Sequence, residues 1–210
     1  MIFGAGGRAG RRTVTEAVRR GHQVTAVVRD PARHPDLAAD GVTVVAGDAT
    51  VAESVAAAAA RQDAAISAVA RTDVPAREFF VTAARALVDG LGRADVRRLV
   101  LVGVGTTLGA APGMAVHDAP EFPAEYRAFS VGHGAELEVL RDSILDWLVL
   151  APPPEVLDDG APRTGRYRLG DHRVLPPEVP PRTFPYADLA VALVDEIETP
   201  EHHRELVAVG

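Results

Sequence analysis

The first residues whose type and spacing could do chemistry are glycines near the start of the chain. Gly4, Gly7 and Gly10 stand three residues apart in the stretch GAGGRAG. Glycine adopts positive φ in tight turns and lets the backbone approach a ligand closely. Between a strand and a helix, such a loop is typical of a pyrophosphate site at the helix start. We therefore expect six loop residues to bind a dinucleotide, the alternative being a structural turn: Gly4, Gly6, Gly7, Arg8, Ala9 and Gly10.

The residues after the second apolar run indicate which dinucleotide this would be. Val24–Val28 is followed by Arg29 and Asp30. An acid at this position binds the ribose 2′-hydroxyl of NAD, whereas a base accepts the 2′-phosphate of NADP. Because Arg29 comes first and Arg33 is near, we expect NADP(H) to be preferred over NAD(H). The alternative is a surface Arg–Asp pair of small energetic effect.

Asp48 and Ala49 directly follow the third apolar run, at residues 42–45. In a dinucleotide-binding fold this position lies beside the adenine ring, and we expect both residues to contact the cofactor. Asp48 could equally cap the alanine-rich helix expected at residues 52–60, since aspartate is a favoured helix N-cap.

The elements that must position these residues alternate along the chain. Apolar runs predict strands, amphipathic or alanine-rich stretches predict helices, and Gly21 is expected to end the first helix. Segments 105–123 and 151–185 read as irregular, apart from a strand expected at 166–169. This order predicts an α/β fold: a single Rossmann-type domain over residues 1–210, with a doubly wound parallel sheet and helices on both faces. The expected strands are 2–3, 24–28, 42–45, 64–69, 99–102, 147–150 and 206–209, and the expected helices are 11–20, 52–60, one from Pro75 through Leu91, 135–142 and 186–197.

Composition excludes several classes of function. The 210 residues carry a net charge of −7, which argues against a nucleic-acid partner. No apolar run is long enough for a membrane span, and no signal-like start is present, so we expect a cytoplasmic protein with a small-molecule substrate. All 22 basic residues are arginine, which excludes any mechanism that needs a lysine. No metal-binding spacing of histidines is present, and we expect no metal.

In this order and spacing, several stretches resemble one family along nearly the whole chain. The stretches are GAGGRAGRR, GHQVTAVVRDPAR, VTVVAGDAT, DAAISAV, VRRLVLVG, LDWLVLAPP, TGRYRLG and YADLAVALVDEIE. They are similar to the NAD(P)H-binding, NmrA-like branch of the atypical short-chain dehydrogenase/reductases, which includes relatives of biliverdin reductase B and of flavin and quinone reductases. The resemblance implies a nicotinamide cofactor, with phosphate at Gly4 to Gly10, 2′-phosphate at Arg29 and adenine at Asp48. It places the nicotinamide beside five residues: Val69, Ala70, Gly103, Ala151 and Pro152.

The sequence departs from that family at the catalytic positions. Short-chain dehydrogenases usually pair a tyrosine with a lysine four positions on, but Tyr126 is followed at that spacing by Ser130. The candidate proton donors that remain are His133, Tyr126 and His117. We favour His133, because a histidine can donate a proton near neutral pH. The alternative for His133 is a residue that caps or packs.

These observations predict an NADPH-dependent oxidoreductase that transfers hydride to a planar acceptor, such as a flavin or a quinone-like small molecule. A missing Tyr–Lys pair does not prevent this reaction, because the cofactor carries the hydride and protons can come from solvent. Two alternatives stay open. One is a non-catalytic, NmrA-like regulator that senses NADP(H), and the other is a non-redox isomerase or dehydratase on the same scaffold.

Overall fold

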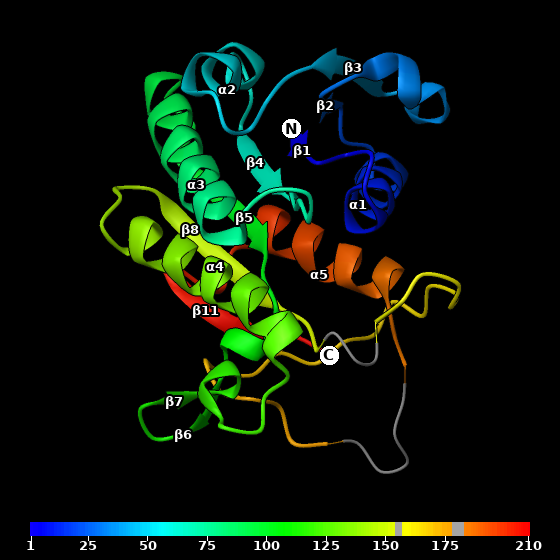
Figure 1. The fold of residues 1–210 in the computed structure, drawn as a ribbon. Coiled ribbons are helices and arrows are strands. Elements are labelled where there is room, and N and C mark those ends of the chain that lie inside the picture. Colours follow the sequence, from blue (N-terminus) through cyan, green and yellow to red (C-terminus); the bar gives the residue numbers. More distant parts are fainter. Residues whose placement is uncertain (154–156, 178–182) are drawn as a thin grey trace.

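A seven-stranded, all-parallel sheet forms the centre of the protein (Figure 1). The computed structural model describes residues 1–153, 157–177 and 183–210. The chain starts in the middle of the sheet, adds two strands on one side and then crosses to the other side. A crevice for ligands in such sheets lies where this direction reverses, here between β1 and β4. From edge to edge the order is β11 (Glu205–Ala208), β8 (Asp146–Ala151), β5 (Arg98–Val102), β4 (Ala64–Ser67), β1 (Ile2–Phe3), β2 (Val24–Val28) and β3 (Val42–Ala46).

Helices cover both faces of the sheet and bury an apolar core on each (Figure 1). Successive strand residues point to opposite faces, so Ile2 belongs to one core and Phe3 to the other. The first core lies under α1 (Arg8–Arg19) and α5 (Tyr186–Glu198), which pack against each other. The second lies under α2 (Ala52–Ala59), α3 (Ala76–Arg93) and α4 (Ala124–Arg141). The predicted α/β fold with a doubly wound parallel sheet is therefore confirmed.

Helix α4 is much longer than the sequence predicts. It begins at Ala124, whereas the expected helix begins at residue 135. Gly132 and Gly134 reduce the intrinsic helix propensity of this stretch, but packing overrides that preference. A Cβ added at Gly132 would lie 2.9 Å from the carbonyl carbon of Ala76. Gly132 therefore allows α4 to approach α3 closely, and the contact stabilises the helix that propensity disfavours.

The prediction of a strand at residues 166–169 is wrong. Only Leu169 forms an isolated antiparallel bridge, with Val209. Residues 166–169 alternate between arginine and an apolar or aromatic side chain, which is the pattern typical of a half-buried strand. Hydrogen bonds to side chains of α5 fix the preceding backbone instead, as described below.

The described parts of the two segments expected to be irregular lie at the carboxyl edge of the sheet (Figure 1). Segment 105–123 contains 3₁₀ turns at Gly105–Thr107 and Val116–Asp118, separated by a hairpin of β6 (Gly109–Ala111) and β7 (Met114–Ala115). The described part of segment 151–185 contains β9 (Leu157–Asp158), which pairs in parallel with β10 (Phe184–Pro185). Two further short 3₁₀ turns, Pro31–Arg33 and Pro35–Leu37, follow β2. Within the described residues, no helix has the length and apolar character that crossing a membrane requires.

Candidate functional site

The glycine loop joins β1 to α1 in a conformation that larger residues would not allow. Gly4 has φ of +71°, and a Cβ at this position would lie 2.5 Å from the carbonyl oxygen of Ala68. A Cβ at Gly10 would lie 2.1 Å from the carbonyl oxygen of Gly4. Gly4 therefore lets the loop turn against β4, and Gly10 lets α1 pack directly on the loop. The fold itself therefore requires glycine at positions 4 and 10 of the predicted pattern, because any side chain there would collide with the backbone.

The N-terminus of α1 is open toward the carboxyl end of β1. Gly7 is the N-cap residue, and no side chain among the described residues caps the helix there. The first turn also contains no acidic residue. The first N–H groups of a helix have no partner within the helix, and the helix dipole makes this end attractive to anions. A cradle of close-packed glycines at an uncapped helix start fits the pyrophosphate of a dinucleotide.

His34 and Arg11 support this loop, although the sequence gives no sign of it. The imidazole of His34 packs on Gly6, where an added Cβ would lie 2.5 Å from Cε1 of the ring. Arg11 donates from Nε to the carbonyl oxygen of Gly6 and from Nη2 to Nδ1 of His34, each over 2.9 Å. Arg11 also forms an ion pair with Asp36. Because the arginine donates to Nδ1, the hydrogen of the neutral imidazole lies on Nε2.

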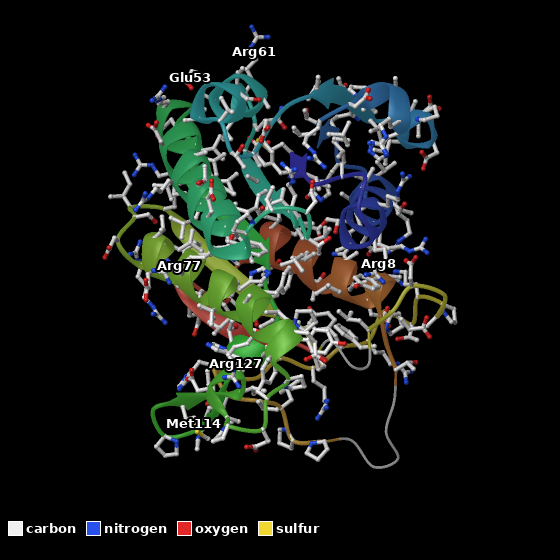
Figure 2. All side chains as sticks on the ribbon, viewed as in Figure 1. Arg8, Glu53, Arg61, Arg77, Met114 and Arg127 are labelled. Carbon is white, nitrogen blue, oxygen red and sulfur yellow. The ribbon has the colours of Figure 1, made fainter. Side chains whose placement is uncertain are left out.

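A cavity of about 310 Å³, the cofactor cavity, opens beside the glycine loop. It lies at the carboxyl ends of β1 to β4. Three residues predicted to bind cofactor, Arg8, Ala9 and Gly10, begin α1 next to the loop and do not line this cavity. Figure 2 shows Arg8 beside α5, where its guanidinium lies 5.3 Å from the centre of the Tyr186 ring. The predicted residues that do line the cofactor cavity are Gly4, Gly6, Gly7, Arg29, Asp48, Ala49, Val69 and Ala70.

The end of β2 presents positive charge to the cofactor cavity. Arg29 and Arg33 line it, whereas Asp30 does not. Asp30 instead accepts a hydrogen bond of 3.1 Å from the backbone N–H of Ala32 and so caps the 3₁₀ turn at Pro31–Arg33. Among the described residues, Arg29 and Asp30 form no ion pair with each other. Asp30, the acid that could bind a ribose hydroxyl, thus lies outside the cavity lining and has one carboxylate oxygen bonded to the backbone.

Asp48 also lines the cofactor cavity, and its carboxylate is held in a fixed orientation. Oδ1 accepts hydrogen bonds from N–H and Oγ1 of Thr50, at 2.8 and 2.6 Å. Burial raises the pKa of Asp48, but these hydrogen bonds and the charges of Arg29 and Arg71 outweigh burial and lower it overall. Asp48 is not the N-cap of α2, which is Val51. The alternative reading of Asp48 as a helix cap is therefore wrong.

A second cavity, of about 800 Å³, lies at the carboxyl ends of β5, β8 and β11, and we call it the acceptor cavity. Its described lining is mostly apolar and includes Leu108, Val116, Leu175 and Phe184. Of the residues predicted beside the nicotinamide, Ala151 lines this cavity, while Val69 and Ala70 line the cofactor cavity. The two remaining predicted residues, Gly103 and Pro152, follow β5 and β8 and line neither cavity.

The candidate proton donors lie outside both cavity linings. His133 is buried between α3 and α4, with its ring 3.8 Å from the ring of Phe80 and Nδ1 3.0 Å from Oε2 of Glu136. Tyr126 is 62% exposed on α4. His117 donates from Nδ1 to the carbonyl oxygen of Thr106 over 2.7 Å.

Sequence reasoning missed the polar residues that line the acceptor cavity, which include Thr106, Arg166 and Asp188. The Thr106 hydroxyl lies 2.7 Å from the hydroxyl of Ser130, and both residues are buried. Tertiary folding brings these residues together from distant parts of the chain, so no local pattern could have identified them. Within the described residues, no group of three or more histidine or acidic side chains could hold a metal ion.

The similarity of this chain to known proteins extends over nearly its whole length. Residues 4–200 match the NAD(P)H-binding family. The Bacillus subtilis protein YwnB is 35% identical over 213 residues, which represent 99% of this chain and 96% of that protein. The structure of a candidate NADH-flavin reductase from Streptococcus pneumoniae has a TM-score of 0.85 and 27% identity, covering 99% of this chain and 96% of that one. ChuY, called an anaerobillin reductase, from Escherichia coli O157:H7 has a TM-score of 0.77 and 25% identity, covering 99% and 94%.

Proposed function

The chain belongs to the NAD(P)H-binding family, and from that premise we propose that it is an NADPH-dependent reductase of a planar acceptor. One observation carries this proposal. The cofactor cavity ends at residues that follow β4, and the acceptor cavity begins at residues that follow the adjacent strand β5. We expect a dinucleotide that extends from the glycine loop across the ends of these strands to reach both cavities. Two relatives whose names contain the word reductase support this reading.

In this proposal, different residues around the cofactor cavity bind different parts of the dinucleotide. The glycine loop and the start of α1 bind the pyrophosphate, and Asp48 with Ala49 flanks the adenine. Arg29 and Arg33 donate hydrogen bonds to the 2′-phosphate, because both line the cavity while Asp30 lies outside it and caps the 3₁₀ turn. Charge-assisted contacts of this kind are the strong ones in phosphate recognition. The nicotinamide end then lies past Val69 and Ala70, toward Gly103, Ala151 and Pro152.

The protein's contribution to the proposed reaction is orientation and exclusion of water. The bound nicotinamide supplies the hydride. The apolar lining of the acceptor cavity packs against a planar ring and limits access of water to it. No tyrosine–lysine pair can form in a chain without lysine, so we infer that the proton needed by the reduced acceptor comes from solvent. This suits acceptors whose reduced form gains a proton at an accessible nitrogen or oxygen.

The placement of the candidate acids favours one competing function. His133, His117 and Tyr126 line neither cavity, which suits a protein that senses NADP(H) without turnover. A sensor binds the cofactor, distinguishes its redox states and leaves NADPH unconsumed in the presence of any acceptor. A reductase consumes NADPH only when an acceptor is present.

One experiment separates these functions. Purified protein is titrated with NADPH and NADH, and the reduced-nicotinamide absorbance is then followed while flavins and quinones are added. Tighter binding of NADPH than NADH with acceptor-dependent loss of absorbance is the expected result. Binding without loss for every acceptor tried would replace the reductase by the sensor. Binding of neither nucleotide would refute both.

A further inference from the structure

Building on the proposed reductase function, we propose that the acceptor cavity selects planar acceptors that carry an anionic group, a carboxylate or a phosphate. Arg166 is the residue that binds this anion. Arg166 lines the acceptor cavity on the segment between β9 and α5.

The backbone on either side of Arg166 is held in place by buried or partly buried acids. Asp188 is 1% exposed and accepts hydrogen bonds from N–H and Oγ1 of Thr164 and from N–H of Gly165, at 2.5 to 2.9 Å. On the other side, the Tyr167 hydroxyl donates to Asp195 over 2.5 Å. Arg166 therefore projects from a segment whose position is set before any ligand binds, which reduces the entropy lost on binding.

A further anchor ties the same segment to α1. Arg163 donates from Nε and Nη2 to the two carboxylate oxygens of Glu16, at 2.9 and 3.0 Å. Glu16 is only 3% exposed. Arg163 is thus occupied in a structural ion pair, in contrast to Arg166 three residues later.

The side chain of Arg166 has no partner. Within the described part of the chain, its guanidinium forms no hydrogen bond and no ion pair. The acidic residue on the described cavity lining is Asp188, and its two oxygens are already occupied by Thr164 and Gly165. The guanidinium is thus available to a ligand, and its planar donor pair matches a carboxylate or phosphate.

The surroundings of Arg166 define the rest of the ligand. Leu108, Val116, Leu175 and Phe184 give the cavity apolar walls suited to a conjugated ring. The chain as a whole is acidic, with a net charge of −7. An anionic ligand therefore needs a local positive charge to bind here, and among the described residues Arg166 presents an uncompensated one.

A matched pair of flavins tests this inference. FMN and riboflavin carry the same ring, but only FMN carries a phosphate. Binding of each is measured by quenching of flavin fluorescence in the presence of NADP⁺. We expect FMN to bind about tenfold or more tightly than riboflavin. Arg166→Gln should remove that difference by weakening FMN alone, and Arg166→Lys should restore part of it.

The control is Arg61→Gln, because Arg61 is exposed in the turn before β4, at the amino edge of the sheet (Figure 2). It removes the same charge and should change neither flavin affinity. NADPH affinity should stay unchanged in all three variants, which also shows that they fold. Equal affinities of the wild type for FMN and riboflavin, binding of neither flavin, or equal losses of both on Arg166→Gln would overturn the proposal.

This experiment separates the inference from the proposed function, because equilibrium binding requires no turnover. Arg166-dependent preference for FMN without NADPH oxidation would retain the anion site and refute the reductase. NADPH oxidation at equal efficiency with both flavins would retain the reductase and refute the anion site.

Discussion

Replacing Gly10 by alanine tests whether the close contact between α1 and the glycine loop builds the cofactor cavity. The added Cβ would lie 2.1 Å from the carbonyl oxygen of Gly4 and 2.8 Å from Cα of Ala5, where ordinary contact begins at 3.4 Å. Both neighbours are backbone, so neither can rotate away. The N-terminus of α1 must therefore move away from the loop.

Gly134→Ala is the matched control, because Gly134 also lies inside a helix, α4, and an added Cβ meets nothing within 4 Å. Alanine is favoured over glycine in a helix interior by about 0.8–1.0 kcal/mol. We expect Gly134→Ala to stabilise the protein by about that amount and to raise Tm by about 2–4 °C. In Gly10→Ala the same gain is opposed by overpacking, which typically costs about 1–3 kcal/mol. Gly10→Ala should therefore have an unchanged or lower Tm.

The effect of Gly10→Ala on cofactor binding should be larger than its effect on stability. Charge-assisted hydrogen bonds contribute about 1.5–3 kcal/mol each, so misplacing two N–H donors weakens NADPH binding about 100-fold or more. Thermal unfolding without ligand and a fluorescence titration with NADPH measure the two effects separately. An increase in Tm equal to that of Gly134→Ala, together with wild-type NADPH affinity, would refute this account of the loop.

Three further predictions concern single side chains. Arg29→Gln should weaken NADPH about 10- to 100-fold in titrations and leave NADH nearly unchanged; equal losses would rule out the 2′-phosphate contact. Hydrogen bonds from Arg19 outweigh burial and, with those from Arg163 and Arg20, hold the pKa of Glu16 well below its usual value. The stability from Glu16 is therefore complete above the unfolded-state pKa of about 4.3 and is lost as pH falls below it. Glu16→Gln should lose about 2 kcal/mol at pH 7 in denaturant titrations and show a shallower loss in acid; parallel pH profiles would contradict this. Tyr126→Phe should leave NADPH oxidation within about twofold of wild type, since Tyr126 is 62% exposed and lines neither cavity; a large loss of rate would return Tyr126 to the reaction.

Local pattern predicts most of the fold because the central parallel strands are buried on both faces and read as continuous apolar runs. Val24–Val28 is a strand of this kind. The edge strand Val42–Ala46 is less buried, and its β-branched residues identify it instead. Gly21 ends the first helix region as predicted, with φ of +89°. The predictions that are wrong concern segments whose structure is decided by contacts between residues far apart in the sequence. Gly132 belongs to a helix because α3 packs on it, and Arg166 lies outside a strand because Asp188 fixes the backbone before it.

The sequence likewise predicts the part of the candidate site that is contiguous in the chain and misses the part that folding assembles. The glycine loop is contiguous in sequence, so its spacing is visible without a structure. The acceptor cavity draws Thr106, Arg166 and Asp188 from three separate parts of the chain. Nothing in the local sequence distinguishes Arg166, which is unpaired, from Arg163, which is paired with Glu16. Only the tertiary partners of an arginine show whether its charge is available to a ligand.

Helix α1 links the glycine loop beside the cofactor cavity to the segment that lines the acceptor cavity. Gly10, in the first turn of α1, packs on Gly4 and Ala5, and Glu16, less than two turns later, holds Arg163 on the segment that lines the acceptor cavity. Hydride transfer requires donor and acceptor atoms about 3–3.5 Å apart, and small displacements reduce the rate strongly. We expect a single helix that packs on the glycine loop and also holds the segment of Arg163 to limit changes in the distance between the two cavities. We therefore expect the buried ion pair of Glu16 to serve positioning as well as stability, because it joins the segment that carries Arg166 to the helix that the cofactor phosphate would meet.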